Sequence, residues 1–128
     1  MKEVLIFSKA VRVKKFVDIL HVRKPSYMSE LFEKAKSLES NQDYERAIFY
    51  YSLVLFDDVL NYAALQSRGY CKLQEGTAKS SKELISGAIK DLEKSISVAG
   101  NLGIRDNIHV ARKFLEIANK ELQKAQVF

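Results

Sequence analysis

The most informative stretch of the sequence is NQDYERAIFYY, at residues 41–51. Its first residues favour a turn, and Asp43 is a good N-cap for a helix that begins at Tyr44. The apolar residues that follow recur at helical spacing, namely Ala47, Ile48, Tyr51, Val54 and Leu55. Asp57 and Asp58 end this pattern. The stretch therefore predicts a turn followed by an amphipathic helix.

A second apolar stripe precedes this turn. Pro25 disfavours a helical conformation at Lys24, and Ser26 is a good N-cap, so we expect a helix over residues 27–40. Its stripe consists of Met28, Leu31, Phe32, Ala35 and Leu38. The two stripes together predict a pair of antiparallel helices joined by a short turn.

Three further helices are expected downstream. The third runs over about 60–75 with Gly76 as a left-handed cap, and residues 77–82 then form an inserted polar loop. Ser80 and Glu83 have capping-box spacing for a fourth helix, which ends before Gly100, and a last helix covers about 105–125. The chain has 128 residues, 47% of them apolar, one proline, and no apolar run long enough to span a membrane. The sequence therefore predicts one all-α domain.

The positive charge of the chain is concentrated at its N-terminus. The net charge is +5, and residues 1–24 carry seven basic and two acidic side chains. The rest of the chain carries fourteen of each and is neutral. We expect the basic segment, residues 1–25, to be helical, and an isolated strand over residues 4–7 would have no partner.

Three roles stay open for the basic segment. It could dock on the domain as an extra capping helix, or it could bind nucleic acid or an anionic membrane surface. A transit peptide is the third, and Glu3, Asp18 and the scarcity of serine disfavour it.

The two helix pairs also resemble each other. Their first helices match at an offset of 34 residues in three pairs: Leu31 and Leu65, Ala35 and Gly69, Gln42 and Gly76. Their second helices match at an offset of 41, in Ala47 and Ala88 and in Tyr51 and Leu92. Small residues let one helix approach the bulky side chains of its neighbour, so the pattern indicates a structural repeat.

This pattern resembles the tetratricopeptide repeat, in which a large residue precedes a small one by four positions and the second helix carries alanine and then an aromatic residue. Leu31, Ala35, Ala47 and Tyr51 meet that pattern. The resemblance implies antiparallel helix pairs stacked as a short right-handed solenoid, with repeat one at 27–58, repeat two at 60–99 and a capping helix at 104–125. An unrelated helical bundle with an accidental offset is the alternative.

The resemblance further implies a concave groove lined by the first helix of each pair. The family's groove positions fall here on Ser29, Phe32, Lys36, Glu39, Ser40, Ala63, Gln66, Tyr70, Leu73, Gln74, Arg105, Ile108, Arg112, Leu115 and Glu116. Eight of them are expected to bind a partner: Phe32, Lys36, Gln66, Tyr70, Leu73, Arg105, Ile108 and Arg112. Phe32 and Leu73 would alternatively be core residues. This mixed surface suits a peptide or amphipathic helix that carries acidic residues.

One subtype of the family grips the C-terminal dicarboxylate of chaperones with lysine, asparagine and arginine side chains. Phe32, Lys36 and Ser67 stand here at three of the clamp positions, so two to three donors are missing. We expect no chaperone tail to bind in this way.

Residues with catalytic or metal-binding chemistry are sparse. His21 and His109 have no metal-ligand spacing with each other or with Cys71, which is expected to be a buried, inert thiol. The adjacent Asp57 and Asp58 fit a solvated helix end better than an acid-base pair. No glycine-rich phosphate loop occurs. We therefore expect no enzyme activity, no cofactor and no metal site.

The sequence thus predicts a non-enzymatic adaptor that binds another protein. The alternative is nucleic-acid or membrane-surface binding through the basic segment. A single cysteine fits a reducing, cytoplasmic environment, and self-association stays open.

Overall fold

The computed structural model describes residues 24–106 and 108–127. These residues form five helices and no strand: α2 (Lys24–Ser40), α3 (Tyr44–Asp57), α4 (Tyr62–Lys79), α5 (Lys82–Asn101) and α6 (Ile108–Val127). The prediction of an all-α fold is confirmed. The helix expected within residues 1–25 lies outside the described residues, apart from its last two positions, which belong to α2.

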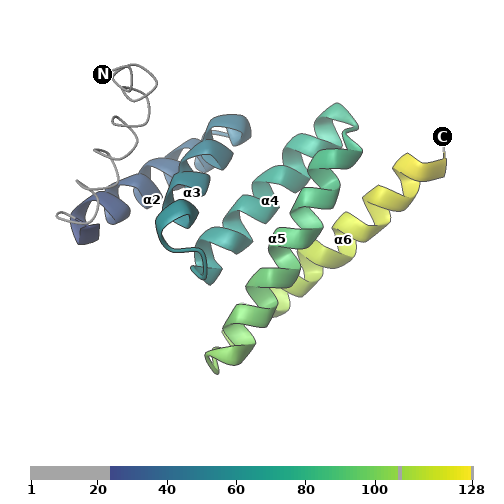
Figure 1. Ribbon diagram of the computed structural model, residues 1–128. Coiled ribbons are helices and arrows are strands. Elements are labelled where there is room, and N and C mark those ends of the chain that lie inside the picture. The colour runs from purple at the N-terminus through teal and green to yellow at the C-terminus, as the bar shows by residue number, and fades with distance from the viewer. Residues whose placement is uncertain (1–23, 107, 128) are drawn as a thin grey trace, which may run out of the picture.

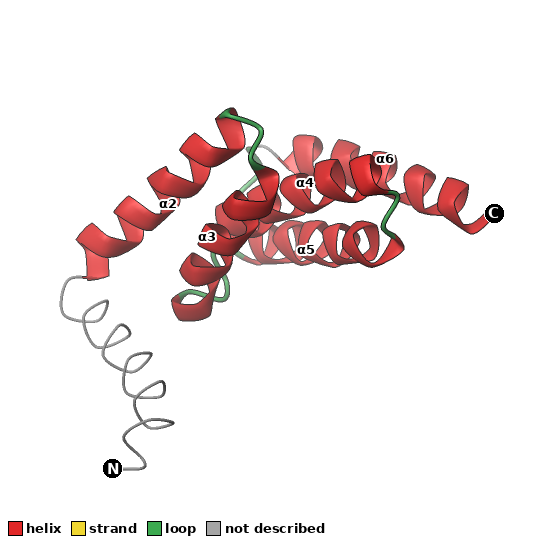
Figure 2. Cartoon of the chain, turned by 90° about the horizontal axis from the view of Figure 1, so that it is seen from above, coloured by secondary structure: helices red, strands yellow, loops and turns green. Residues whose placement is uncertain are grey.

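The helices are arranged in two layers (Figures 1 and 2). Each helix packs on the next one along the chain, and α4 also contacts α6. Seen from above, α2, α4 and α6 lie on one side, and α3 and α5 lie on the other (Figure 2). This zigzag is the arrangement that stacked helix pairs produce. It gives α4 a central position, in contact with α3, α5 and α6.

The starts of α2 and α3 follow from their first residues. Asp43 caps α3 as expected, because its carboxylate accepts a hydrogen bond from the Arg46 backbone N–H at 3.3 Å. The expected start at Ser26 is wrong, since α2 already begins at Lys24. Proline is tolerated in a first helical turn, where its missing N–H would have no partner, so Pro25 lies inside the helix.

The polar loop expected at residues 77–82 is also wrong, because this part of the chain is mostly helical. α4 runs through Gly76 to Lys79 and α5 begins at Lys82. Gly76 is therefore not a left-handed cap. It is buried against α5, where a Cβ atom would come within 2.9 Å of Ile85 Cγ1. Glycine permits this close approach of the two helices.

The cap positions between α4 and α5 are shifted by one residue from the expected ones. Ser80 adopts a positive φ of 53° and closes α4, so the capping box of Ser80 and Glu83 does not form. Ser81 is the N-cap of α5 instead, and its hydroxyl accepts a hydrogen bond from the Leu84 backbone N–H at 3.2 Å.

The residues added in the second helix pair extend the C-terminal end of α4 and the N-terminal end of α5. Gln42 and Ser80 are structural counterparts, because each closes a helix with positive φ, 63° and 53°. They are 38 residues apart, four more than the offset of 34, so α4 extends about one turn further beyond Leu65 than α2 extends beyond Leu31. The other three added residues lie between Ser81 and Ala88. One extra turn in each of two antiparallel helices preserves their pairing.

The last helix begins at Ile108, later than the expected start near residue 105. Gly103, with a φ of 73°, ends the preceding helix, and the Ile104 N–H donates a hydrogen bond to the Ala99 carbonyl at 2.9 Å. This closing motif uses the residues that would otherwise extend α6 toward its N-terminus.

Residues matched between the second helices of the two pairs are buried alike. Ala47 and Ala88 are completely buried, as are Tyr51 and Leu92. Gly69 lies directly against Leu92, because a Cβ atom on Gly69 would be 2.8 Å from Leu92 Cγ. The expected contact between a small residue and a bulky one is confirmed for this pair.

The core consists of two groups of buried residues. One group joins α2, α3, α4 as far as Cys71 and Val98 of α5, and the other joins α4, α5 and α6 around Leu73, Ile85, Ala88 and Ala118. Ser95 is buried between α5 and α4, and its hydroxyl donates a hydrogen bond to the Tyr62 carbonyl at 2.8 Å. That bond satisfies a polar group that would otherwise destabilise the core.

Candidate protein-binding site

A hollow of about 370 Å³ lies between α2 and α4, and we call it the α2/α4 pocket. Its lining comes from α2, α3 and α4: Phe32, Lys36, Glu39, Ser40, Tyr51, Tyr62, Ala63, Gln66 and Ser67. Three of the eight expected binding residues, Phe32, Lys36 and Gln66, meet in this pocket. Glu39, Ser40 and Ala63 were also among the wider set of groove positions.

The floor of the α2/α4 pocket is an ordered group of polar and aromatic side chains. The Tyr51 hydroxyl donates a hydrogen bond of 2.6 Å to the Glu39 carboxylate, and the Phe32 ring meets the Tyr51 ring edge to face at 5.7 Å. Tyr51 is completely buried, and this burial, reinforced by the bond to Glu39, raises its pKa far above the ordinary value. A fixed floor of this kind presents Phe32 in one orientation.

The rim of the pocket carries groups that can recognise a peptide. The Lys36 ammonium lies 5.7 Å from the centroid of the Phe32 ring, a cation–π distance. Gln66, Ser40 and Ser67 add amide and hydroxyl groups that can bond to a peptide backbone. The pocket therefore offers an aromatic surface, one cation and several neutral hydrogen-bonding groups.

Tyr70 lies outside this pocket, further along α4. Its ring packs against Tyr44 at 6.0 Å and against Phe114 of α6 at 4.9 Å, so it links three helices. Burial raises the pKa of Tyr70 to about 12. Its half-buried ring therefore has a structural role, whereas the binding role that the sequence predicted stays a prediction.

The other four expected residues do not line the α2/α4 pocket. Leu73 is only 2% exposed and belongs to the core between α4, α5 and α6, so its expected contact with a partner is wrong. Arg105 is exposed in the connection before α6, Arg112 is exposed on α6, and Ile108 is half-buried at the start of that helix.

An ionic cluster that the sequence did not reveal lies on the other side of α4 from the α2/α4 pocket. Asp91 of α5 is 6% exposed and receives two hydrogen bonds from the Arg68 guanidinium, at 2.7 and 2.8 Å. The Lys72 ammonium lies 3.1 Å from the same carboxylate, and Arg68 also donates to the Ser52 hydroxyl at 3.1 Å. The cluster therefore joins α3, α4 and α5. In the sequence, the cluster is indicated by two basic residues four positions apart, Arg68 and Lys72, and by one acidic residue, Asp91, within the apolar stripe of the next helix.

Cys71 and the two histidines are the residues whose side chains suggested catalysis or metal binding. Cys71 is completely buried, and burial is the main cause that raises the pKa of its thiol far above the ordinary value. His109 is exposed on α6, and His21 lies outside the described residues. Within residues 24–106 and 108–127, no three His, Cys, Asp or Glu side chains are grouped as a metal site would need. No helix in that part of the chain has both the length and the apolar character needed to cross a membrane.

In comparisons with known proteins, no family model, no curated protein and no solved structure matches this chain. Function is therefore inferred from the residues and their geometry.

Proposed function

We propose that this chain is a non-enzymatic adaptor of the tetratricopeptide-repeat type that binds a peptide segment of another protein in the α2/α4 pocket. The observation that carries the proposal is the coincidence of this pocket with positions inferred beforehand from the repeat pattern. Six of its lining residues, Phe32, Lys36, Glu39, Ser40, Ala63 and Gln66, belong to that set.

The chemistry of the α2/α4 pocket defines the segment that would fit. A volume of about 370 Å³ lies in the range of small-molecule sites and suits one or two large side chains. An apolar or aromatic side chain would pack on Phe32, and an acidic residue would lie near Lys36. The backbone of the segment would bond to Gln66 and the two serines.

A filling variant with a matched control tests this proposal. Peptides selected from a displayed random library on the full chain serve as the probe. Ala63→Phe places a ring inside the pocket, whereas Ala78→Phe adds the same ring to an exposed position of the same helix. We expect Ala63→Phe to weaken binding of the pocket-specific peptides by at least about tenfold and Ala78→Phe to leave it unchanged.

Loss of binding must be separated from loss of folding. Circular dichroism and thermal unfolding of both variants provide that control. If folded Ala63→Phe binds every selected peptide as tightly as the parent, the α2/α4 pocket is not the recognition site.

A second candidate function rests on the charge of residues 1–24, which account for the entire net charge of +5. Under this alternative the basic segment binds nucleic acid or an anionic membrane surface. A labelled DNA duplex and vesicles containing an anionic lipid are the probes. Binding that falls steeply with salt and is abolished by Lys14→Glu with Lys15→Glu would favour the alternative over the adaptor.

A further inference from the structure

The outer side of α3 carries large apolar side chains that the rest of the domain does not bury. Residues 47–56, AIFYYSLVLF, include no charged side chain. Phe49 is 58% exposed and Phe56 is 62% exposed, and Val59 and Leu60 in the following turn are also more than half exposed. An apolar helix face that the chain itself does not cover commonly marks a protein interface.

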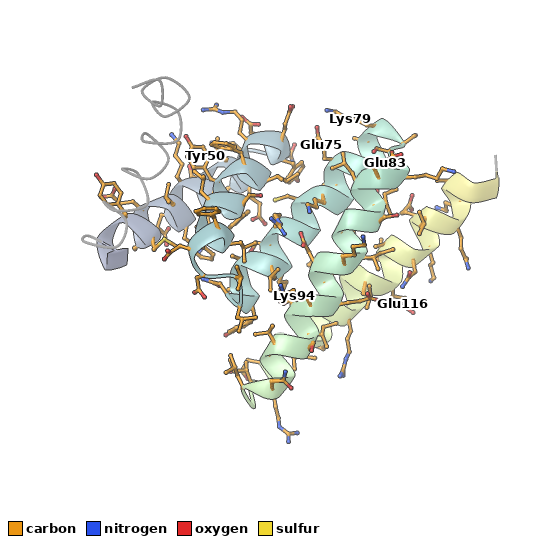
Figure 3. All side chains as sticks on the ribbon, in the orientation of Figure 1. Tyr50, Glu75, Lys79, Glu83, Lys94 and Glu116 are labelled. Carbon is orange, nitrogen blue, oxygen red and sulfur yellow. The ribbon has the colours of Figure 1, made fainter. Side chains whose placement is uncertain are left out.

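Part of this apolar surface forms one wall of a second hollow, of about 330 Å³, which we call the α3/α5 pocket. Its lining residues are Ser52, Leu55, Phe56, Val59, Leu65, Arg68, Lys90, Asp91 and Lys94. Leu55, Phe56 and Val59 make the apolar wall, whereas Lys90 and Lys94 of α5 make a basic wall. Figure 3 labels Lys94 on α5, in the view that faces the α3 and α5 layer.

The charge of the α3/α5 pocket is positive and uncompensated. Asp91 is the single acidic residue in the lining, and its carboxylate is already bound by Arg68 and Lys72. Within the part of the chain that the structure describes, neither Lys90 nor Lys94 forms a salt bridge. The pocket is therefore complementary to carboxylates beside an apolar side chain.

We propose that the α3/α5 pocket docks an acidic amphipathic helix of a partner protein. Lys90 and Lys94 are four residues apart on one helix, so their side chains are neighbours on its surface. Two carboxylates spaced by four residues on a partner helix match that separation. A leucine or aromatic residue on the same face of the partner inserts beside Phe56.

Charge argues against the two other occupants that this chain could supply. The segment of residues 1–24 carries seven basic side chains and two acidic ones, so the lysines of the pocket repel it. In a second copy of the chain, residues 25–128 are neutral overall and offer these lysines no net negative charge. An acidic partner gains electrostatic attraction that neither of these occupants supplies.

The α3/α5 pocket is independent of the α2/α4 pocket. Successive residues of an α-helix are about 100° apart around its axis, which places Leu65 and Arg68 on nearly the opposite side of α4 from Ala63 and Ser67. The two pockets thus use different sides of one helix. Each can be altered without changing the lining of the other.

The experiment uses the full chain and a displayed library of helical peptides of about 20 residues, long enough to form helix when bound. Selected peptides are sorted by whether they carry acidic residues four positions apart beside an apolar stripe. We expect Phe56→Ala, and Lys90→Glu combined with Lys94→Glu, each to weaken this acidic class by at least about tenfold. Retained binding by either folded variant would overturn the proposal.

Matched controls replace exposed apolar and lysine side chains that lie outside the α3/α5 pocket. Ile117→Ala removes an exposed apolar side chain of α6 outside the pocket, and Lys113→Glu with Lys120→Glu reverses two exposed lysines of the same helix. These controls and Ala63→Phe should leave the acidic class bound. If no acidic amphipathic class is selected, or if Phe56→Ala instead abolishes self-association measured by light scattering, the proposed occupant is wrong.

Discussion

Replacing Gly69 by alanine tests the contact between α4 and α5 most directly. Alanine normally stabilises a helix interior by about 1 kcal/mol relative to glycine. At Gly69, however, the new methyl group would lie 2.8 Å from Leu92 Cγ and 3.2 Å from the Ala88 carbonyl oxygen. The backbone oxygen cannot move without displacing α5, and Leu92 is completely buried.

The contact distances determine the sign of the change in stability. Overpacking of a tight core site costs about 1–3 kcal/mol, and a contact of 2.8 Å to a buried side chain belongs to the upper part of that range, about 2–3 kcal/mol, which exceeds the gain in helix propensity. We therefore expect Gly69→Ala to lower the unfolding free energy by about 1–2 kcal/mol. For a domain of this size, that change lowers the melting temperature by roughly 5 °C or more. Gly100→Ala is the matched control and should be neutral or stabilising, because no packing partner among the described residues lies within 4 Å of the position that its methyl group would take.

A double-mutant cycle identifies the partner of Gly69. Chemical denaturation of the parent, Gly69→Ala, Leu92→Ala and the double variant gives the four free energies. In the Leu92→Ala background, the methyl group at residue 69 occupies space that the leucine has vacated, so Gly69→Ala should become neutral or stabilising. If Gly69→Ala stabilises the parent as Gly100→Ala does, the contact between these two helices is not as described.

Removing the carboxylate of the ionic cluster by Asp91→Ala should lower the unfolding free energy by about 2–3 kcal/mol in chemical denaturation, because two partly buried cations lose their partner. An unchanged value would mean that the cluster contributes nothing. Ser80→Gly should raise the melting temperature, because glycine relieves a left-handed conformation that costs other residues about 1 kcal/mol. Alkaline pH should destabilise the fold, since the unfolded chain loses tyrosine protons near the ordinary pKa of 10.0 while burial holds that of Tyr70 near about 12. The unfolding free energy should therefore fall as pH rises through this window, and less so in Tyr70→Phe.

The parts of the fold that local chemistry controls could be predicted from the sequence. Asp43 caps α3 through its own side chain, three residues from the N–H that it binds, and the apolar stripes lie on the buried faces. Gly76 shows where this reasoning fails. A missing Cβ permits either a left-handed cap or a close helix contact, and only the position of Ile85 in the folded chain distinguishes them.

The candidate site was predictable to a smaller extent, for a related reason. Phe32, Lys36 and Gln66 meet in one pocket because the repeat pattern fixes which side of a first helix faces the next. Leu73 is at an inferred groove position but is covered by α6, whose start the sequence placed too early. The ionic cluster was not predicted because Arg68, the hydrogen-bond partner of Asp91, is 23 residues away in the chain.

The central helix connects the two proposed binding surfaces without merging them. One side of α4 contributes Ala63 and Ser67 to the α2/α4 pocket, and the other contributes Leu65 and Arg68 to the α3/α5 pocket. Arg68 donates two hydrogen bonds to Asp91, so its guanidinium, which lines the α3/α5 pocket, is fixed before a partner binds. Because the two linings share no residue, occupancy of one pocket removes no contact from the other. Under the two proposals, a peptide would bind on one layer and an acidic helix on the other, so the chain would connect two partners as an adaptor does.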